Sequence, residues 1–445
     1  MRVLAATIVA ALAATTGGAV AHSASATPPF AIAPASVALD WNTAAVTAVR
    51  TAQVPNETAT GMRGLYQTEG MLYMGYVQAA VYDAATKIGH RYEPYHHFNA
   101  PAGNASLAAA VIAAAYNTLV YYLGDPSGAL AAKYAASIGA LQTDATTQRG
   151  IAVGQAAAAD IEALRANDGR NAAVGTYGVG TLQPGLWILA ATPGSLQVAQ
   201  TPWMAFMQPF MLESTSQFRA PPPPALTSAQ YTADFNEANA YGAKTGSLRS
   251  DEQTAIGLFW NANVISQANQ ALRDAAVQHG FDLVNTARLL AMGTMIPTDA
   301  GMACFDSKYT YQAWRPISAI RNADIDGNPD TTAVPTWTPV LATPNHPEYP
   351  AAHGSMTSAQ AEVFATFLGT DQINLDIHGF DPAGPAGNLN AVRHFNSVDD
   401  LRTEIVNARL WAGVHYPFSG LAGVTLGQNV AQYDLKHAFL RGKKH

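Results

Sequence analysis

The chain has 445 residues, of which 49% are hydrophobic and only 12% are charged, and its formal net charge at pH 7 is -7. This composition describes a mildly acidic globular protein with enough apolar side chains for a large core. It argues against nucleic acid as a partner, because no basic stripe is present to neutralise phosphates. The single cysteine, Cys304, excludes an internal disulfide.

The first 21 residues have the pattern of an export signal. Arg2 precedes an uncharged run rich in Ala, Leu and Val, and this run closes on Ala19-Val20-Ala21. A basic start, a short apolar run and a small-x-small end are typical of a cleaved signal peptide. We therefore predict a signal peptide over residues 1–21, a mature chain that starts near His22, and a secreted or periplasmic location.

Helical periodicity dominates the mature chain, and turn clusters separate the periodic stretches. We therefore predict a mainly α protein. The helices are expected near residues 36–53, 68–88, 105–123, 127–141, 143–167, 227–243, 250–279, 281–293, 300–315, 356–368, 398–412 and 420–433.

The stretch from residue 102 to residue 124 carries no charge and has the length of a membrane span. Its apolar content is mostly alanine, and polar residues such as Asn104 and Asn117 interrupt it. These features favour a helix in the protein interior. We predict no membrane partner.

Two irregular stretches interrupt the helical pattern in the middle of the chain. One is glycine-rich and covers residues 168–194, and the other contains the four prolines 221–224, which favour a stiff extended segment. We take the prolines as a seam between an N-terminal helical layer, residues 22–220, and a C-terminal helical bundle, residues 225–445. The apolar helices are compatible with a symmetric homo-oligomer.

The first of three cationic motifs lies in the predicted helix 300–315. Lys308 and Arg315 are seven positions apart, so a helix would place them on one face about 10 Å apart, where both can reach one anion. Pro316 disfavours helical geometry at Arg315 and marks the helix end. The alternative is an exposed basic edge on an amphipathic helix. Cys304 stands in an apolar run and is interpreted as buried filler.

The second motif follows an irregular stretch over residues 322–350. His353 stands just before a helix that we expect to begin near Met356, with Ser355 as its N-cap. Helix starts bind anions through free backbone N–H groups and the helix dipole. His353 would lie at the rim of such a site and exchange protons near neutral pH. The alternative is a capping or core histidine.

The third motif combines Arg409, near the end of the predicted helix 398–412, with His415. Six helical steps would point these side chains about 120° apart, so the helix must loosen for both to face one site, and Gly413 offers a place for that. The guanidinium of Arg409 suits oxyanions. His415 could bond to a central atom through one ring nitrogen if a hydrogen bond holds the other. The alternative is a histidine that packs at the helix end.

Taken in order, the motifs Lys-x6-Arg-Pro, Pro-x-x-His and Arg-x5-His resemble the three-part signature shared by vanadium-dependent haloperoxidases and type 2 phosphatidic acid phosphatases. Upstream segments are similar to the bacterial vanadium haloperoxidase branch. They are residues 79–84, residues 92–95, Gly185-Leu186-Trp187, Pro202-Trp203, Pro209-Phe210 and the run from Gln217 to Trp260.

The resemblance implies an α-helical bundle of the vanadium haloperoxidase and acid phosphatase type, with vanadate as cofactor. It implies that Lys308, Arg315 and Arg409 bind vanadate oxygens, together with the backbone N–H of Ala352. His353 would act as acid and base, and His415 would form the bond to vanadium. The substrates would be hydrogen peroxide, polarised by Lys308, and a halide, which is oxidised to hypohalous acid. A small organic molecule could accept the halogen.

Two departures from the family pattern leave other functions open. The family usually has Ser-Gly where this chain has Ala351-Ala352, and often has Asp where Ser419 stands four residues after the second histidine. One alternative is a soluble acid phosphatase in which His415 forms a phosphohistidine. Another is an anion-binding protein without turnover. Trp260, His346 and Phe418 are candidates for the wall of the site, with ordinary packing as the alternative.

Overall fold

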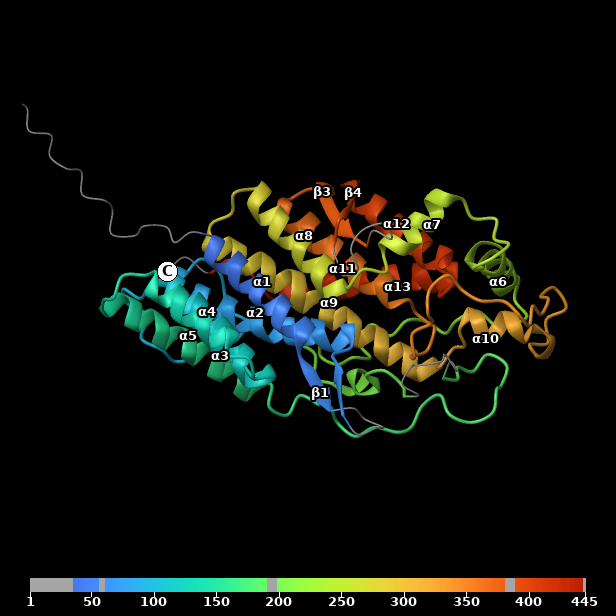
Figure 1. Cartoon of the computed structure of the whole chain (residues 1–445), viewed down its shortest axis with the longest axis horizontal. Coiled ribbons are helices and arrows are strands. Elements are labelled where there is room, and N and C mark those ends of the chain that lie inside the picture. The colour runs from blue at the N-terminus through green and yellow to red at the C-terminus, as the bar shows by residue number, and fades with distance from the viewer. Residues whose placement is uncertain (1–34, 56–60, 190–197, 381–388, 443–445) are drawn as a thin grey trace, which may run out of the picture. The chain divides into compact units, whose positions relative to one another are not determined.

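The structure is a computed structural model that describes residues 35–55, 61–189, 198–380 and 389–442. The predicted signal peptide lies outside the described residues. In the described ranges the chain is mainly α-helical, which confirms the fold class predicted from the periodicity (Figure 1).

The described helices agree closely with the predicted ones through most of the chain. They are α1 Ser36–Thr51, α2 Gln67–Gly89, α3 Leu107–Leu123, α4 Ala129–Gly139, α5 Ala145–Leu164, α6 Ala229–Gly242, α7 Asp251–Phe259, α8 Val264–Gln278, α9 Leu283–Tyr311, α10 Pro316–Arg321, α11 Ala352–Leu368, α12 Val398–Trp411 and α13 Pro417–His437, with the 3-10 turns η1 Pro202–Phe206 and η2 Ala323–Ile325.

Side-chain caps explain where several of these helices begin. Ser106, Asp144, Asn263 and Asp282 stand directly before α3, α5, α8 and α9, and each side chain accepts a hydrogen bond from a backbone N–H in the first turn. Ser397 forms a capping box with Asp400 at the start of α12. Such caps satisfy backbone donors that have no partner inside the helix.

Two short antiparallel hairpins were not predicted. One joins β1 Gln53–Pro55 to β2 Met62–Gly64, and the other joins β3 Gln372–Gly379 to β4 Ala391–Ser397. In β3 the side chains alternate between exposed and buried, with Ile373, Leu375 and Ile377 on the buried side. This period of two is the ordinary pattern of a half-buried strand.

Helix α9 lies at the centre of the helical packing. It contacts α2, α8, α11 and α13 (Figure 1), and every residue from Leu289 to Tyr309 is buried. A helix that is buried on all sides needs partners on all sides. Because α9 ends beside the cationic motifs, this packing fixes one wall of the candidate site.

The prediction was wrong about two helix boundaries near this core. The predicted helix 250–279 is divided into α7 and α8 around residues 260–263, where Asn263 caps the second helix. The predicted helices 281–293 and 300–315 form one helix, α9, with Pro297 inside it. Proline in a helix interior costs about 3 kcal/mol, and the burial of apolar side chains along α9 offsets this cost.

Helices α11 and α13 approach each other closely through glycines of α13. A Cβ atom at Gly423 would lie 2.4 Å from the backbone oxygen of Ala351, and one at Gly427 would lie 2.0 Å from that of Ser355. Only glycine allows such a contact between backbones. The start of α11, which carries His353, is therefore held against α13.

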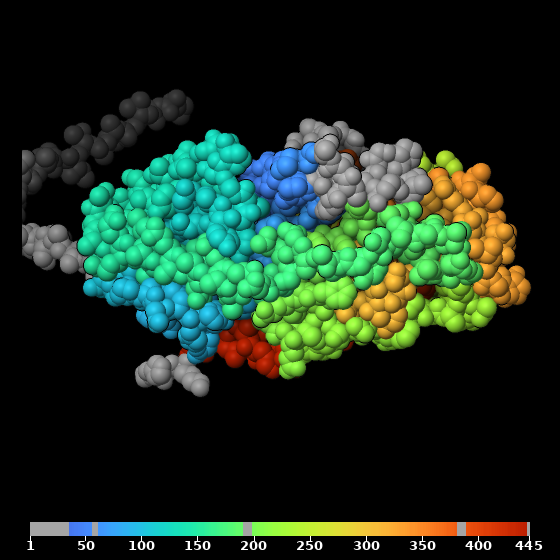
Figure 2. All heavy atoms as spheres, turned by 90° about the horizontal axis from the view of Figure 1, so that it is seen from below, coloured from blue at the N-terminus to red at the C-terminus, as the bar shows by residue number. Residues whose placement is uncertain are grey.

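The residues on the two sides of the proline run 221–224 pack against each other, because α2 contacts α9 and one hydrophobic core contains residues of both helices. The division into two layers stays a prediction. The described residues between α5 and α6 run along the surface (green in Figure 2). None of the helices in the described ranges has both the length and the hydropathy that a membrane span requires.

Candidate functional site

Lys308 lies in the last turn of α9, and its side chain is fully buried. Its Nζ donates hydrogen bonds of 2.8 Å to the backbone oxygens of Pro347 and Glu348. Burial lowers the pKa of Lys308 to about 7, because a buried ammonium loses its hydration. A nearby anion would favour the charged form of this amine.

The backbone between Lys308 and Arg315 differs from the predicted continuous helix. Helix α9 ends at Tyr311, Gln312 has a left-handed φ of 49°, and Arg315 precedes α10 in extended conformation. Lys308 and Arg315 therefore do not share one helix face, but both donate to backbone oxygens of residues 346–348. Pro316 occupies the first position of α10, where its missing N–H has no consequence.

The Arg315 guanidinium joins two loops of the site. Its Nε donates to the backbone oxygen of His346 at 3.0 Å, and its Nη1 donates to the backbone oxygen of Val414 at 2.9 Å. Its Nη2 lies 3.0 Å from His346 Nδ1. Burial lowers the pKa of Arg315 to about 10, so the group keeps its charge at neutral pH.

His353 lies in the first turn of α11, which begins four residues earlier than predicted. Ala351 is the N-cap and provides no side-chain cap, while the Ser355 hydroxyl donates to the Ala351 backbone oxygen. The expected N-cap at Ser355 is therefore wrong. No described backbone carbonyl accepts from the N–H groups of Ala352, His353 and Gly354. These donors are the free N–H groups of a helix start.

His353 is partly exposed, and its ring forms no hydrogen bond with the described residues. Burial, and then the charges of Arg409, Lys308 and Arg315, lower the pKa of His353 well below its ordinary value. The imidazole is therefore neutral at pH 7 and can accept a proton.

Arg409 lies in the last turn of α12 and is 4% exposed. Its Nε and Nη1 have no hydrogen-bond partner among the described residues. Burial, and then the charge of Arg315, lower its pKa to about 9, so the guanidinium stays charged at neutral pH. An unpaired buried guanidinium costs several kcal/mol, and an anion would compensate this cost.

His415 follows α12 after a turn in which Gly413 has a φ of +75°. This left-handed turn ends the helix as predicted and lets His415 approach Arg315. His415 Nδ1 lies 2.8 Å from Glu348 Oε1, and His415 Nε2 lies 3.2 Å from Arg315 Nη1. Burial, and then the charges of Arg315, Lys308 and Arg409, lower the pKa of His415 well below its ordinary value.

The contacts of His415 determine its tautomer. A guanidinium can only donate hydrogen bonds, so His415 Nε2 must accept from Arg315. A neutral imidazole then carries its proton on Nδ1 and donates it to the Glu348 carboxylate. The ring therefore presents the lone pair of Nε2 on the side of the cations, where it can attack or coordinate a central atom.

The structure thus brings the five predicted side chains to one buried, positively charged region. Arg315 contacts His415 directly, and the charges of Lys308 and Arg409 act on both imidazoles. Among the described residues of this region, three buried side chains are cationic and one, Glu348, is a carboxylate. Such an excess of buried charge is stable only with a compensating anion.

Sequence reasoning missed Glu348 and gave His346 only as a candidate for the wall. Both stand in the irregular stretch before α11 and both are buried. A charged residue inside the proline-rich run Pro347-Glu348-Tyr349-Pro350 was the available signal, because charged residues are rarely buried without a partner.

The other candidates for the wall have different surroundings. Phe418 stacks on Tyr416 with ring centroids 5.1 Å apart, directly after His415. Trp260 donates from Nε1 to Glu404 at 2.9 Å and packs against Phe395, which fits the packing interpretation. Cys304 is buried, as expected, and its thiol donates to the Pro350 backbone oxygen.

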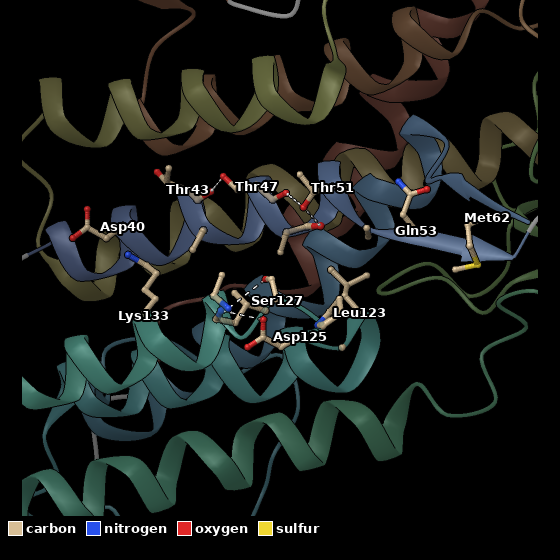
Figure 3. A pocket seen from close by; sticks show the side chains of 17 residues that line it. Asp40, Thr43, Thr47, Thr51, Gln53, Met62, Leu123, Asp125, Ser127 and Lys133 are labelled. Atoms are coloured by element: carbon tan, nitrogen blue, oxygen red, sulfur yellow. Dashed lines mark hydrogen bonds between the residues drawn. The ribbon is translucent and has the colours of Figure 1, made fainter.

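A surface pocket of about 550 Å³ contains none of these residues. It is lined by α1, by Gln53 and Met62 of the first hairpin, and by residues from Leu123 in α3 to Lys133 in α4 (Figure 3). Thr43, Thr47 and Thr51 face it, but their hydroxyls donate to backbone oxygens of α1. Asp40, Gln53 and Lys133 also line the pocket, but none of the three cationic motifs contributes to it.

Comparisons with known proteins agree with the site. Residues 288–441, which contain all three cationic motifs, match the family model of the VCPO second helical-bundle domain. The vanadium chloroperoxidase of Curvularia inaequalis is 27% identical over 305 residues. That match covers 53% of this chain and 49% of the relative, so the chain matches about half the length of its curated relative.

Solved structures show the same fold over more of the chain. A bacterial vanadium-dependent iodoperoxidase superposes with a TM-score of 0.73 at 20% identity, covering 92% of this chain and 98% of that chain. A holo-type bacterial vanadium-dependent chloroperoxidase gives a TM-score of 0.67 at 18% identity, covering 83% and 92%. These matches confirm the helical fold predicted from the sequence, and the family model and the curated relative support the resemblance.

Proposed function

We propose that this chain, whose fold is that of the vanadium-dependent haloperoxidases, oxidises halide with hydrogen peroxide to hypohalous acid at a vanadate held by His415. The observation that carries the proposal is the buried guanidinium of Arg409, whose Nε and Nη1 have no partner among the described residues. It lies in the region where the lone pair of His415 Nε2, which accepts from Arg315 Nη1, can bond to a central atom in place of that contact.

The residues fit a tetrahedral oxyanion such as vanadate. His415 Nε2 would bond to vanadium, and Arg409, Arg315 and Lys308 would hold the oxygens. The free N–H of Ala352 could replace the serine hydroxyl that Ala351 lacks, because any residue except proline provides a backbone donor. When bound, vanadate supplies a Lewis acid that activates hydrogen peroxide for attack by halide.

The side chains around this position have separate roles in the reaction. His353 is neutral and has no described partner for its ring, so it can take a proton from hydrogen peroxide and return it to the leaving oxygen. The Lys308 ammonium would polarise the peroxide. The cations compensate negative charge in a site from which water is largely excluded, where each contact is stronger than in water.

The test is a bromination assay with purified protein, vanadate, hydrogen peroxide and bromide. We expect bromination of a diketone, followed by its loss of absorbance, to depend on vanadate and to disappear in His415→Ala. Hydrolysis of an aryl phosphate, inhibited by vanadate and without bromination, would instead support the acid phosphatase. Anion binding with neither activity would leave a binding protein.

We also propose that the protein is exported to the periplasm or the medium. The composition of residues 1–21 supports this proposal. N-terminal sequencing of protein from the native cells should give a start near His22, and a cytosolic protein that keeps Met1 would contradict it. A small organic halogen acceptor and a homo-oligomer stay predictions.

A further inference from the structure

Glu348 is the buried carboxylate of the site, and its two contacts come from the segment that carries His415. Its Oε1 accepts from His415 Nδ1 at 2.8 Å and from the Tyr416 backbone N–H at 3.2 Å. The two side chains are 1% and 3% exposed. Because the contact is shielded from water, the carboxylate constrains both the orientation and the tautomer of the imidazole.

The backbone of Glu348 is fixed by two further hydrogen bonds. Its N–H donates to the Ala313 backbone oxygen at 2.9 Å, and its oxygen accepts from Lys308 Nζ at 2.8 Å. Ala313 stands between the end of α9 and Arg315. The carboxylate therefore does not depend on a mobile side chain in solvent, and its position is tied to that of two cations of the site.

Position 419 explains why a carboxylate is needed at 348. The signature that the chain resembles often has aspartate four residues after the second histidine, and here Ser419 stands there. Ser419 is buried, its hydroxyl has no hydrogen-bond partner among the described residues, and its backbone oxygen accepts from the Ala351 N–H. An aspartate at 419 would place two carboxylates together, which is unfavourable in a buried site.

We propose that Glu348 is the positioning residue of His415, and that its carboxylate replaces the one absent at position 419. It accepts the Nδ1 proton and fixes the ring so that the lone pair of Nε2, which here accepts from Arg315, is directed at the position of the central atom of the oxyanion. The proposal rests on the proposed function only for the identity of that atom as vanadium.

The test compares two anions, because only one is expected to bond to Nε2. Orthovanadate can form a bond to nitrogen, whereas inorganic phosphate is held by charge and hydrogen bonds alone. In Glu348→Ala we expect the vanadate affinity, measured by calorimetry, to fall about 10- to 100-fold. The phosphate affinity should stay equal or rise, because a negative charge near the anion has been removed. Equal losses for both anions, or no loss for either, would overturn the proposal.

The exchange of carboxylates provides the matched control. In Glu348→Ala/Ser419→Asp we expect most of the vanadate affinity to return, because the new carboxylate can again accept from Nδ1. Ser419→Asp alone should bring no gain. Glu348→Gln, which keeps the size of the side chain and an accepting oxygen, should retain the Nδ1–H tautomer. If the double variant binds vanadate as weakly as Glu348→Ala does, a carboxylate at 419 cannot replace Glu348, which would contradict the proposal.

Nitrogen-15 spectra of histidine-labelled protein read the tautomer without any anion. The His415 signals, identified by their loss in His415→Ala, should show the proton on Nδ1 in the original protein. In Glu348→Ala the proton should stay on Nδ1, because Arg315 still donates to Nε2, but the Nδ1 signal should lose the shift that its hydrogen bond to the carboxylate produces. Unshifted signals in that variant would overturn the proposal. Absence of bromination in the original protein, with these results intact, would contradict the proposed function and leave the role of Glu348 supported.

Discussion

Two buried arginines, one in the N-terminal half and one at the candidate site, have opposite surroundings. Arg165, at the end of α5, donates from Nε to Asp168 at 3.0 Å and from Nη1 to the Pro209 backbone oxygen at 2.9 Å. Its Nη2 also donates to the backbone of Gln208. Arg409 is similarly buried, but its Nε and Nη1 have no described partner.

The difference separates a structural charge from a functional one. Around Arg165 the carboxylate of Asp168 also accepts from Tyr76 and from the Arg170 backbone N–H, so the charge is compensated inside the protein. Around Arg409 the compensation must come from a ligand. Burial alone does not identify a site, whereas a buried cation without a partner indicates where an anion can bind.

The largest expected effect is the loss of turnover in His415→Ala, compared with a second histidine that also lies beside a carboxylate. His415→Ala should reduce turnover by about 1,000-fold or more, because it removes the nitrogen that bonds to the central atom. His96→Ala is the control, since His96 contacts Asp160 at 2.6 Å in the N-terminal half. Steady-state bromination rates measure both, and an unchanged rate in His415→Ala would contradict either enzymatic function.

The two arginines should also differ in their effect on stability. Arg165→Met should lower the free energy of unfolding by about 3–5 kcal/mol, because it leaves the buried Asp168 carboxylate without its counter-ion. Arg409→Met should raise the melting temperature in anion-free buffer, because it removes an uncompensated charge. Calorimetric unfolding of both variants tests this contrast. Similar destabilisation by both substitutions would remove the distinction between them.

With bound vanadate, the original protein should become more stable than Arg409→Met, the reverse of the order expected in anion-free buffer. Vanadate at 100 times its Kd should stabilise the original protein by about 2.7 kcal/mol. Arg409→Met should lose about 100-fold or more in vanadate affinity, because two charge-assisted hydrogen bonds are removed. Melting curves with increasing vanadate measure both effects. A variant that gains as much stability from vanadate as the original protein would show that Arg409 does not bind the anion.

Two buried aspartates extend the comparison to negative charges, with the smallest expected effect. Asp299 accepts from the backbone N–H groups of Phe210 and Met211, whereas neither carboxyl oxygen of Asp434 has a described partner. Burial, and then the charge of Asp299, raise the pKa of Asp434 well above its ordinary value. The folded protein then binds more protons than the unfolded chain, so Asp434 reduces stability as the pH rises above about 4.

Asp434→Asn should therefore raise the free energy of unfolding at pH 7 by about 1 kcal/mol and leave it nearly unchanged at pH 4. Asp299→Asn should lower stability at both pH values, because the amide can accept only at one of its two positions. Denaturant titrations at the two pH values measure the differences. A stabilisation by Asp434→Asn that does not depend on pH would show that the carboxylate charge is not its cause.

The sequence predicted most of the helices and the five side chains of the site, because periodicity and motif spacing are local properties. The structure was needed where the packing of distant segments decides the outcome. Pro297 does not divide α9, because the surrounding core stabilises the helix. Lys308 and Arg315 lie on the two sides of the helix end at Gln312 and not along one helix face. Glu348 contacts a histidine 67 positions away, a pairing that no local pattern contains.

The central claim is that the buried cations, of which Arg409 has no described partner, and Nε2 of His415 bind one oxyanion. A crystal structure of the protein grown with orthovanadate tests this most directly. We predict vanadium bonded to His415 Nε2, with vanadate oxygens at Arg409 Nε or Nη1. Vanadium bound elsewhere, with His415 Nε2 still against Arg315 and Arg409 still without a partner, would contradict the claim.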